Sequence, residues 1–329
     1  MRIFTLLVLL FFVSSYAYFG KKNEAQDVFG WAMLLQSPRT VAFEGAGSAL
    51  GSQDFGVAIM NPALLQGSGF GAGISGQSGD LADWQGIAVF SHPFSIGEAN
   101  GRMQHTYGIV DNGDVENLGE EAEPMGTSHP IAQYYAITAA FPLNHFKFGI
   151  TGRCLWQRLS EVDNAQTGMG LAMDWGFLWN SGSARYGFAF MGRHLGQQIR
   201  PFVKGGINGF ALASELAAST FWRLDKNFIW LLECSAPRYS PVAGKLGLEY
   251  RFSESVFARA GMQRNIIEVT RFVRSTFDRN EKSPNAGFYR LFSAGAGYRL
   301  RDIFALDYSY SMLVEGQGSE HRIGLSGAF

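Results

Sequence analysis

The feature that most constrains this chain is a two-residue alternation of polar and apolar side chains, which recurs from residue 68 to the C-terminus. Alternation with this period indicates strands that have two different faces. Fourteen segments of roughly nine to thirteen residues show it: Ser68 to Gly76, Trp84 to His92, Ala99 to Val110, Ile131 to Phe141, Phe146 to Leu159, Thr167 to Trp179, Ala184 to Leu195, Ala211 to Trp222, Asn227 to Ser235, Ala243 to Phe252, Val256 to Arg264, Tyr289 to Leu300, Ile303 to Val314 and Ser319 to Phe329.

The chemistry of the two faces favours a membrane barrel over a soluble sandwich. In the segment that ends at Phe252, Leu248 and Tyr250 share one face, whereas Lys245 and Glu249 share the other. A β-sandwich also alternates, but alternation there places the apolar face in a core and the polar face in water. The strand lengths suit a bilayer, and the strand number is even, as in bacterial outer-membrane barrels. The sequence therefore predicts an all-β, fourteen-stranded antiparallel transmembrane β-barrel.

Composition supports this class and excludes others. The 329 residues include 41 glycines, 14% are aromatic and only 17% are charged, a balance typical of barrels. No run of 18 apolar residues follows the first twenty residues, which excludes a helical membrane protein. A formal net charge of −1 gives no basic field for nucleic acid, so no nucleic-acid partner is expected.

The connections between the predicted strands alternate in length. Tight links such as Pro142 to His145 and Arg301-Asp302 follow even-numbered segments. The much longer connections Asp111 to Pro130, Gly196 to Phe210 and Asn265 to Phe288 follow odd-numbered segments. Outer-membrane barrels have short periplasmic turns and longer external loops. The pattern predicts an N-terminus in the periplasm and long loops outside the cell.

The first part of the chain divides into two predicted regions. Residues 1–17 have a basic start, an apolar stretch and the small-x-small sequence Ser15-Tyr16-Ala17, which is typical of a cleaved secretory signal peptide. Residues 18–67 lack clear alternation. A fourteen-stranded barrel has a lumen wider than its own side chains can fill. We therefore expect residues 18–67 to form a periplasmic or lumenal hatch and residues 68–329 to form the barrel, located in the outer membrane of a Gram-negative type of cell.

The end of the chain resembles the signal by which barrels are delivered to the outer-membrane insertion machinery. Ile323, Leu325 and the terminal Phe329 share one face of the last predicted strand. Gly327 departs from the pattern, because it lies on the same face without being apolar. The expected partners of the barrel are thus the insertion machinery and outer-membrane lipid.

The predicted hatch carries a resemblance to a known family. It contains Arg39, Glu44, Gly45 and Gly47, followed by Asn61-Pro62-Ala63. This arrangement resembles the N-terminal hatch of the PorV/PorQ family, which is related to the FadL transporters of hydrophobic compounds. Gly247 to Arg251 and Leu306 to Tyr310 are similar to strands of the same family, and the short length is closer to PorQ. The resemblance implies a FadL-like fourteen-stranded barrel with a plugged lumen.

Two functions follow from this resemblance. The first is an outer-membrane component of type IX secretion and cell-surface attachment, which binds attachment-complex or cargo proteins. The alternative is a FadL-like channel for the uptake of hydrophobic small molecules. A continuous apolar path with a kinked or gapped strand would favour the channel, whereas a sealed lumen and a loop surface suited to protein contact would favour secretion.

Charged side chains on the inward faces are the remaining candidate site. They are Lys147, Arg153, Asp174, Glu233, Lys245, Glu249, Arg251, Arg259 and Asp307. We expect them to form a salt-bridged network that holds the hatch, with Arg39 and Glu44 as partners, because buried charges must be paired; a polar conduction path is the alternative.

No metal, cofactor or catalytic site is expected. The acidic stretch from Asp111 to Glu123 lacks the ligand order of a calcium loop. None of the six histidines has a nucleophile at a motif spacing. The sequence therefore predicts a protein that is not an enzyme.

Overall fold

The computed structural model describes residues 28–33, 36–51, 55–78, 84–118, 123–160, 166–206, 209–265, 269–270, 274, 290–301, 303–313 and 318–329. The predicted signal peptide, residues 1–17, lies outside them. No helix among these residues is long and apolar enough to cross a membrane.

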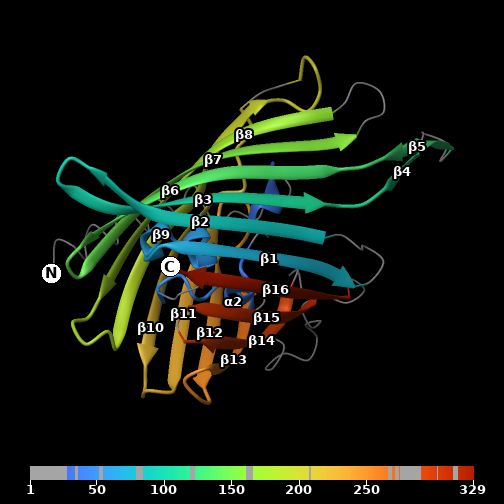
Figure 1. The fold of residues 1–329 in the computed structure, drawn as a ribbon. Coiled ribbons are helices and arrows are strands. Elements are labelled where there is room, and N and C mark those ends of the chain that lie inside the picture. The colour runs from blue at the N-terminus through green and yellow to red at the C-terminus, as the bar shows by residue number, and fades with distance from the viewer. Residues whose placement is uncertain are drawn as a thin grey trace.

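Fourteen antiparallel strands close into one barrel (Figure 1). They are β1 (Gly69–Ser78), β2 (Trp84–Ile96), β3 (Ala99–Asp111), β6 (Ile131–Leu143), β7 (Phe146–Ser160), β8 (Gln166–Asn180), β9 (Tyr186–Arg200), β10 (Glu215–Arg223), β11 (Phe228–Pro237), β12 (Ala243–Arg251), β13 (Val256–Asn265), β14 (Arg290–Leu300), β15 (Phe304–Leu313) and β16 (Ser319–Ala328). The barrel closes where β1 pairs with β16 over its whole length, from Gly69 opposite Ala328 to Ser78 opposite Ser319. The predicted fold class is confirmed.

The connections separate the two ends of the barrel. At one end, here called the short-turn end, no link between consecutive strands exceeds the five residues 181–185. At the other, the long-loop end, the connections include residues 112–130, 201–214 and 266–289. The chain between β3 and β6 was expected to be a plain loop, but it contains a separate hairpin of β4 (Val115–Leu118) and β5 (Pro124–Ser128).

One strand begins later than the alternation predicts. β10 starts at Glu215 rather than at Ala211. The residues before it bond instead to the N-terminal part of the chain: the Val28 N–H donates to the Ala211 carbonyl oxygen at 3.2 Å, and the Ala213 N–H donates to the Val28 carbonyl oxygen at 3.3 Å. A pairing partner nearly two hundred residues away was not visible in the local pattern.

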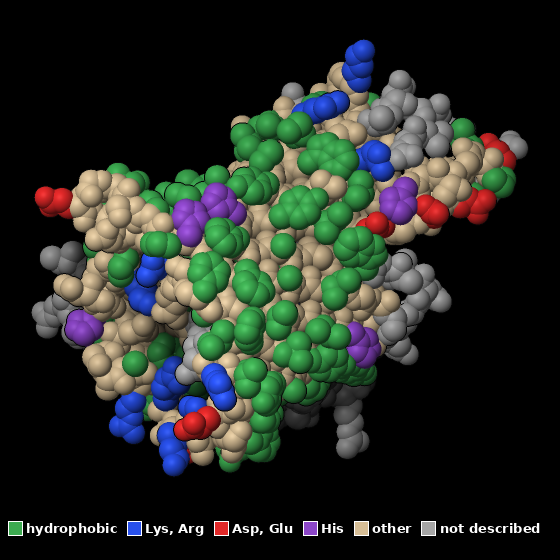
Figure 2. All heavy atoms as spheres, in the orientation of Figure 1, with side chains coloured by type: hydrophobic (Ala, Val, Ile, Leu, Met, Phe, Trp, Pro, Cys, Tyr) green, Lys and Arg blue, Asp and Glu red, His purple; other side chains and the backbone are tan. Residues whose placement is uncertain are grey.

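The outer face of the barrel is apolar, as β15 illustrates. Leu306 is 49% exposed on the outside, whereas its neighbour Asp307 is 7% exposed and faces the lumen. Hydrophobic side chains cover much of the outer wall, and most charged side chains gather toward its two ends (Figure 2). This distribution is what a barrel surrounded by lipid requires.

The described residues before β1 form the N-terminal segment, which consists of residues 28–33, 36–51 and 55–65. It contains η1 (Gly30–Met33), α2 (Pro38–Ala42), η2 (Phe55–Ile59) and η3 (Pro62–Leu64). Ser37 caps α2 by accepting a hydrogen bond from the Thr40 N–H at 3.3 Å, and Pro38 follows at the position where proline starts a helix. Asn61 caps η3 in the same way, accepting from the Ala63 N–H at 3.0 Å.

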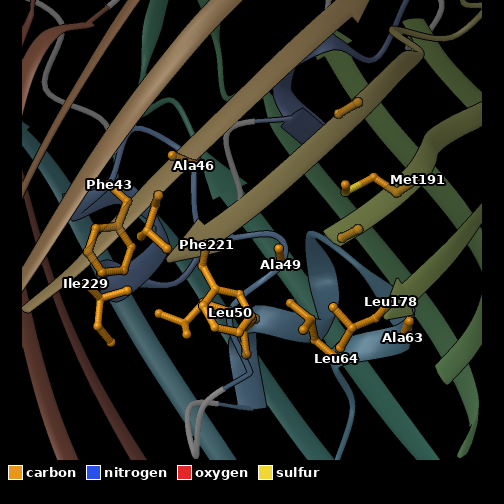
Figure 3. Packing of buried hydrophobic residues seen from close by; sticks show 14 residues of the cluster. Phe43, Ala46, Ala49, Leu50, Ala63, Leu64, Leu178, Met191, Phe221 and Ile229 are labelled. Carbon is orange, nitrogen blue, oxygen red and sulfur yellow. The ribbon is translucent and has the colours of Figure 1, made fainter. Parts of the chain in front are cut away.

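The hydrophobic core lies between the N-terminal segment and the inner wall of the barrel. Phe43, Ala46 and Leu50 of the segment pack with wall residues that include Phe221 and Ile229 (Figure 3). Val41, Ala42 and Phe43 are completely buried. The segment therefore lies inside the barrel, and its short helical turns replace the water that would otherwise contact these apolar side chains.

Candidate functional site

Wall glycines allow the N-terminal segment to approach the barrel closely. A β-carbon at Gly261 of β13 would overlap the backbone of Phe43, and one at Gly149 of β7 would overlap the backbone of Pro62. Within the segment, Gly45 has a φ of +82°, which a residue with a side chain adopts only with strain. The fully buried Asn61 donates from its side-chain amide to the Ser48 carbonyl oxygen at 2.8 Å.

The structure places four of the predicted charged residues in one chain of ion pairs. Arg39 of α2 lies 3.2 Å from a carboxylate oxygen of Glu249 on β12. The same oxygen accepts from Arg259 Nε on β13 at 2.8 Å, and Arg259 also pairs with Asp307 on β15. All four side chains are at least nine-tenths buried. Arg39 thus joins α2 to β12 directly, and through Glu249 and Arg259 to β13 and β15.

A second cluster of ion pairs forms between wall residues and contacts the N-terminal segment directly. Arg193 of β9 pairs with Glu215 at 2.7 Å and with Glu233 at 3.1 Å, and Lys245 lies 3.1 Å from the same Glu233 oxygen. The Arg193 guanidinium also donates to the Ser48 hydroxyl at 2.7 Å and to the Met60 carbonyl oxygen at 2.8 Å. It therefore joins two parts of the segment to the wall.

Further side chains link the segment to the other strands of the wall. Arg153 donates to Asp174 at 2.7 Å and to the Ile59 carbonyl oxygen at 3.0 Å. Glu44 accepts a hydrogen bond from the Ser293 hydroxyl. Arg322 of β16 pairs with Glu320 and donates to the Gln36 carbonyl oxygen at 2.8 Å.

Sequence reasoning missed four buried charges, Arg193, Glu215, Glu320 and Arg322, and for Arg193 the cause is local. β9 contains an irregularity opposite Asp174, where the pairing register with β8 shifts between Met173 and Trp175. His194 has a φ of +52°, so Arg193 and His194 are both buried although they are adjacent in sequence. At such a bulge, the two-residue alternation no longer predicts which face of the strand a side chain occupies. The only warning in the sequence was an arginine and a histidine side by side in a glycine-rich strand.

Two predicted charges lie apart from these clusters. Arg251 faces inward at the end of β12 and donates to the Ser253 carbonyl oxygen at 3.1 Å. Lys147 donates to the Gln66 side chain at 3.0 Å. Among the described residues, no group of three or more His, Cys, Asp or Glu side chains could hold a metal ion.

An apolar cluster lines the lumen toward the long-loop end. Phe29 and Ala32 of the N-terminal segment pack there against wall residues such as Tyr134 and Leu155. Trp31, which packs against the same cluster, donates from its indole N–H to Gln157 at 3.1 Å. Part of the inner surface of the barrel is thus apolar, whereas the interior of a water-filled pore is polar.

The residues predicted to form the C-terminal insertion signal lie on the outer face of β16. Ile323 and Leu325 are about half exposed, and Phe329 is exposed at the short-turn end. Gly327 lies beneath the rings of Phe70 and Phe304, which occupy the space that its own side chain would fill. The aromatic cover accounts for the glycine in an otherwise apolar row, and the signal itself stays a prediction.

Comparison with known proteins gives the fold a context. No family model matches the chain, and no curated protein sequence matches it. The Pseudomonas putida toluene transporter TodX is similar in structure, with a TM-score of 0.58 at 12% identity over 87% of this chain and 95% of that one. The Ralstonia pickettii toluene transporter TbuX has a TM-score of 0.57 at 12% identity, over 89% of this chain and 98% of that one. A Pseudomonas aeruginosa FadL homologue has a TM-score of 0.49 at 12% identity, over 89% of this chain and 98% of that one.

These likenesses correct the predicted function. The expectation that the barrel is a PorV/PorQ-type component of type IX secretion is wrong, because the similar structures are toluene transporters, which support the stated alternative. The structure supplies a physical reason for the error. Glycines and the Asn-Pro-Ala turn serve to pack a segment tightly inside a barrel, and that requirement is independent of the protein's partner. This chain thus shares its fold, a closed fourteen-stranded antiparallel barrel, with these toluene transporters.

Proposed function

We propose that this protein is a FadL-like outer-membrane channel for hydrophobic small molecules, and that the N-terminal segment is its hatch. The observation that carries the proposal is the apolar cluster inside the lumen, contributed jointly by the segment and the wall. A lumen that passed only water and ions would not need apolar residues such as Phe29 and Leu155 facing inward. In this arrangement the short turns face the periplasm, and a signal peptide spanning residues 1–17 directs export.

The toluene transporters TodX and TbuX support the proposal because they have the same fold. The bulged β9 also supports it, since an irregular strand was one of the features expected of a channel. The described barrel strands are nevertheless all paired with their neighbours. Transport through this structure consequently requires the N-terminal segment to move.

A cross-link between the segment and the wall tests this requirement. The Ser219 hydroxyl of β10 donates to the Ala46 carbonyl oxygen at 3.1 Å, so cysteines at these two positions lie close together. The outward-facing Cys154 and Cys234 are first replaced by alanine. Radiolabelled toluene uptake is then measured in a Gram-negative host that lacks hydrocarbon channels, before and after treatment with a short bifunctional thiol reagent.

We expect uptake above that of the empty vector before treatment and a loss of that uptake afterwards. Ala46→Cys alone, treated with the same reagent, is the matched control and should keep its uptake. Uptake no greater than that of the empty vector would refute the channel. Uptake that survives complete cross-linking would refute movement of the segment.

A further inference from the structure

Two histidines meet on the outer wall of the barrel, on the hairpin that β2 and β3 form. His105 lies opposite Phe90, so His92 is its diagonal neighbour across the two strands. Both side chains face outward, as Phe90 and Tyr107 on the same strands do. Figure 2 shows two histidine side chains side by side on this part of the wall. The two residues are thirteen positions apart in the sequence, and the strand register is what brings them together.

The two imidazole rings present the same nitrogen to each other. The Nε2 atoms of His92 and His105 are 3.3 Å apart. The ring planes differ by only 18° and the ring centres are 5.5 Å apart, so both nitrogens lie between the centres with their lone-pair positions facing. Two nitrogens that bind one tetrahedral Zn²⁺ through bonds of 2.0–2.1 Å are about 3.3–3.4 Å apart. The separation is thus already that of two ligands of one ion.

The other nitrogen of each ring has an oxygen partner. His92 Nδ1 lies 2.9 Å from the carbonyl oxygen of Pro93, which can only accept, so Nδ1 carries the proton of the neutral ring and Nε2 keeps its lone pair. His105 Nδ1 lies 2.6 Å from the Tyr135 hydroxyl, which can donate or accept. Histidines that bind metals donate their second N–H to an oxygen, which orients the ring and makes it a better ligand. Both histidines have such a partner.

A metal ion can replace the proton that the two rings share. In the neutral pair, the Tyr135 hydroxyl donates to His105 Nδ1, and His105 Nε2 donates to His92 Nε2. For coordination, the His105 proton moves from Nε2 to Nδ1 and is donated to the Tyr135 oxygen, whose own proton turns toward solvent. A turn of each partly exposed ring then directs both Nε2 lone pairs to one ion. No proton is lost or gained in this exchange.

The histidine pair lies toward the edge of the lipid-facing wall. The Phe90 ring lies 6.1 Å from the ring of Phe329, which is exposed at the short-turn end. His92 is the next outward-facing residue of β2 toward the turn, one position beyond Ser91, where the pairing of β2 with β1 ends. Aromatic side chains of this kind flank the apolar band of a barrel at the boundary with water. An ion from the aqueous side can therefore reach the pair.

We propose that His92 and His105 bind one divalent transition-metal ion of the kind that prefers imidazole, such as Zn²⁺ or Cu²⁺, and that Tyr135 is a positioning residue for this site. Imidazole nitrogen suits these ions, whereas Mg²⁺ and Ca²⁺ take oxygen ligands. Within the described residues, no third His, Cys, Asp or Glu side chain completes the ligand set, so water occupies the remaining positions. The site lies outside the lumen and is independent of the proposed channel function.

His321 is a matched control in the same molecule. It also faces outward, on β16, and its Nδ1 lies 2.8 Å from the Tyr308 hydroxyl. Its Nε2, however, lies 3.3 Å from the Ser319 hydroxyl instead of a second imidazole. His321 therefore has the positioning partner without the second nitrogen ligand.

Binding is tested on the full-length barrel in a neutral maltoside detergent, purified through a streptavidin-binding tag so that no polyhistidine competes. Substoichiometric Cu²⁺ is added so that the tightest site fills first, and electron paramagnetic resonance counts the nitrogens that split the copper signal. The Zn²⁺ affinity is measured by competition with a chromophoric chelator. The test variants are His92→Gln and His105→Gln, and the control is His321→Gln. Heat-modifiable mobility in gel electrophoresis checks that every variant is folded.

We expect a copper signal split by two nitrogens in the native protein and in His321→Gln. Zn²⁺ should bind at least about tenfold more weakly to His92→Gln and to His105→Gln. Tyr135→Phe should keep both nitrogens and weaken Zn²⁺ binding by about tenfold, as removal of an outer partner does.

Three results would overturn the proposal. The first is a copper signal split by fewer than two nitrogens in the native protein. The second is a Zn²⁺ affinity that falls equally in His321→Gln and in the test variants, or in none of them, which would show diffuse binding to surface side chains. The third is competition by Ca²⁺ at the concentration where Zn²⁺ competes. Because no readout involves transport, failure of this site and failure of toluene uptake are distinguishable.

Discussion

Gly261 is the clearest case in which one residue determines how the two parts of this molecule fit together. It faces the lumen on β13, and the backbone of Phe43 occupies the volume where a side chain would stand. A strand loses stability with glycine in its interior, so the residue is accounted for by the close approach of the N-terminal segment. Gly149 has the same relation to Pro62.

Replacement of Gly261 by alanine should weaken the docking of the N-terminal segment. The added methyl group meets the backbone rather than a flexible side chain, and such overpacking costs about 1–3 kcal/mol. The measurement is urea unfolding of the protein in lipid vesicles. Gly244→Ala on β12 is the control, because no atom lies within 4 Å of its β-carbon position. Equal stability of both variants would contradict the docking role.

His129 lies between two carboxylates at the base of the β4–β5 hairpin. Its Nδ1 lies 2.8 Å from Asp114 and its Nε2 lies 2.9 Å from Asp111, so both bonds exist together only when the ring is protonated. These hydrogen bonds raise the pKa of His129 above its usual value. Contacts that hold the proton in this way are complete below the ordinary histidine pKa of about 6.5 and are lost as the pH rises through the raised value.

NMR titration of carbon-labelled histidine rings measures this effect. We expect the His129 signal to titrate at a higher pH than an unperturbed histidine, and Asp114→Asn to move its midpoint to lower pH. An unchanged midpoint in Asp114→Asn would show that the carboxylate does not stabilise the imidazolium.

At the scale of elements, α2 depends on the wall for its position. Its five residues are too few to form a stable helix alone. The Ser37 cap, the ion pair of Arg39 with Glu249 and the burial of Phe43 provide that stability. Of these contacts, the ion pair is the one that can be removed without creating a cavity.

A double-mutant cycle on Arg39→Gln and Glu249→Gln should show a favourable coupling of about 0.5–3 kcal/mol. Glu249→Gln also weakens the bond to Arg259, so the cycle, not the single variants, isolates the contact with α2. The measurement is hydrogen exchange at the backbone amides of α2. A coupling near zero would mean that apolar packing alone holds the helix.

The elements also show which parts of the structure were predictable. The strands β12 and β15 could be located because Lys245, Glu249 and Asp307 alternate strictly with lipid-facing residues. The bulge at His194 could not, since a local change of φ reverses the side of the wall that the neighbouring residues face. Glu215 follows the alternation of β10, but it is the first residue of that strand and comes directly after residues that pair with Val28, far away in the sequence. Long-range pairing and local strain lie outside what a two-residue period encodes.

At the scale of the whole molecule, the N-terminal segment separates a plugged barrel from an open one. Charges within the wall pair largely with each other, as Arg193 and Lys245 do with Glu215 and Glu233. The wall should therefore remain closed when the segment is deleted.

Deletion of residues 28–65 should yield a folded barrel that conducts ions in planar bilayers, because fourteen strands enclose more space than their own side chains fill. The intact protein should conduct far less. Replacement of residues 113–129, which removes the β4–β5 hairpin, is the control and should leave the conductance low. A deletion variant that folds without conducting would show that the wall fills its own lumen.

The contact between Arg322 and Gln36 bears on the order of assembly. It joins the final strand to the start of the N-terminal segment across 286 positions of sequence. A bond of this kind waits for β16, because Arg322 has no fixed place until that strand has paired with β1 and the circle of strands is complete. This attachment of one of the first described residues of the N-terminal segment is thus completed only when the last strand of the chain is in place.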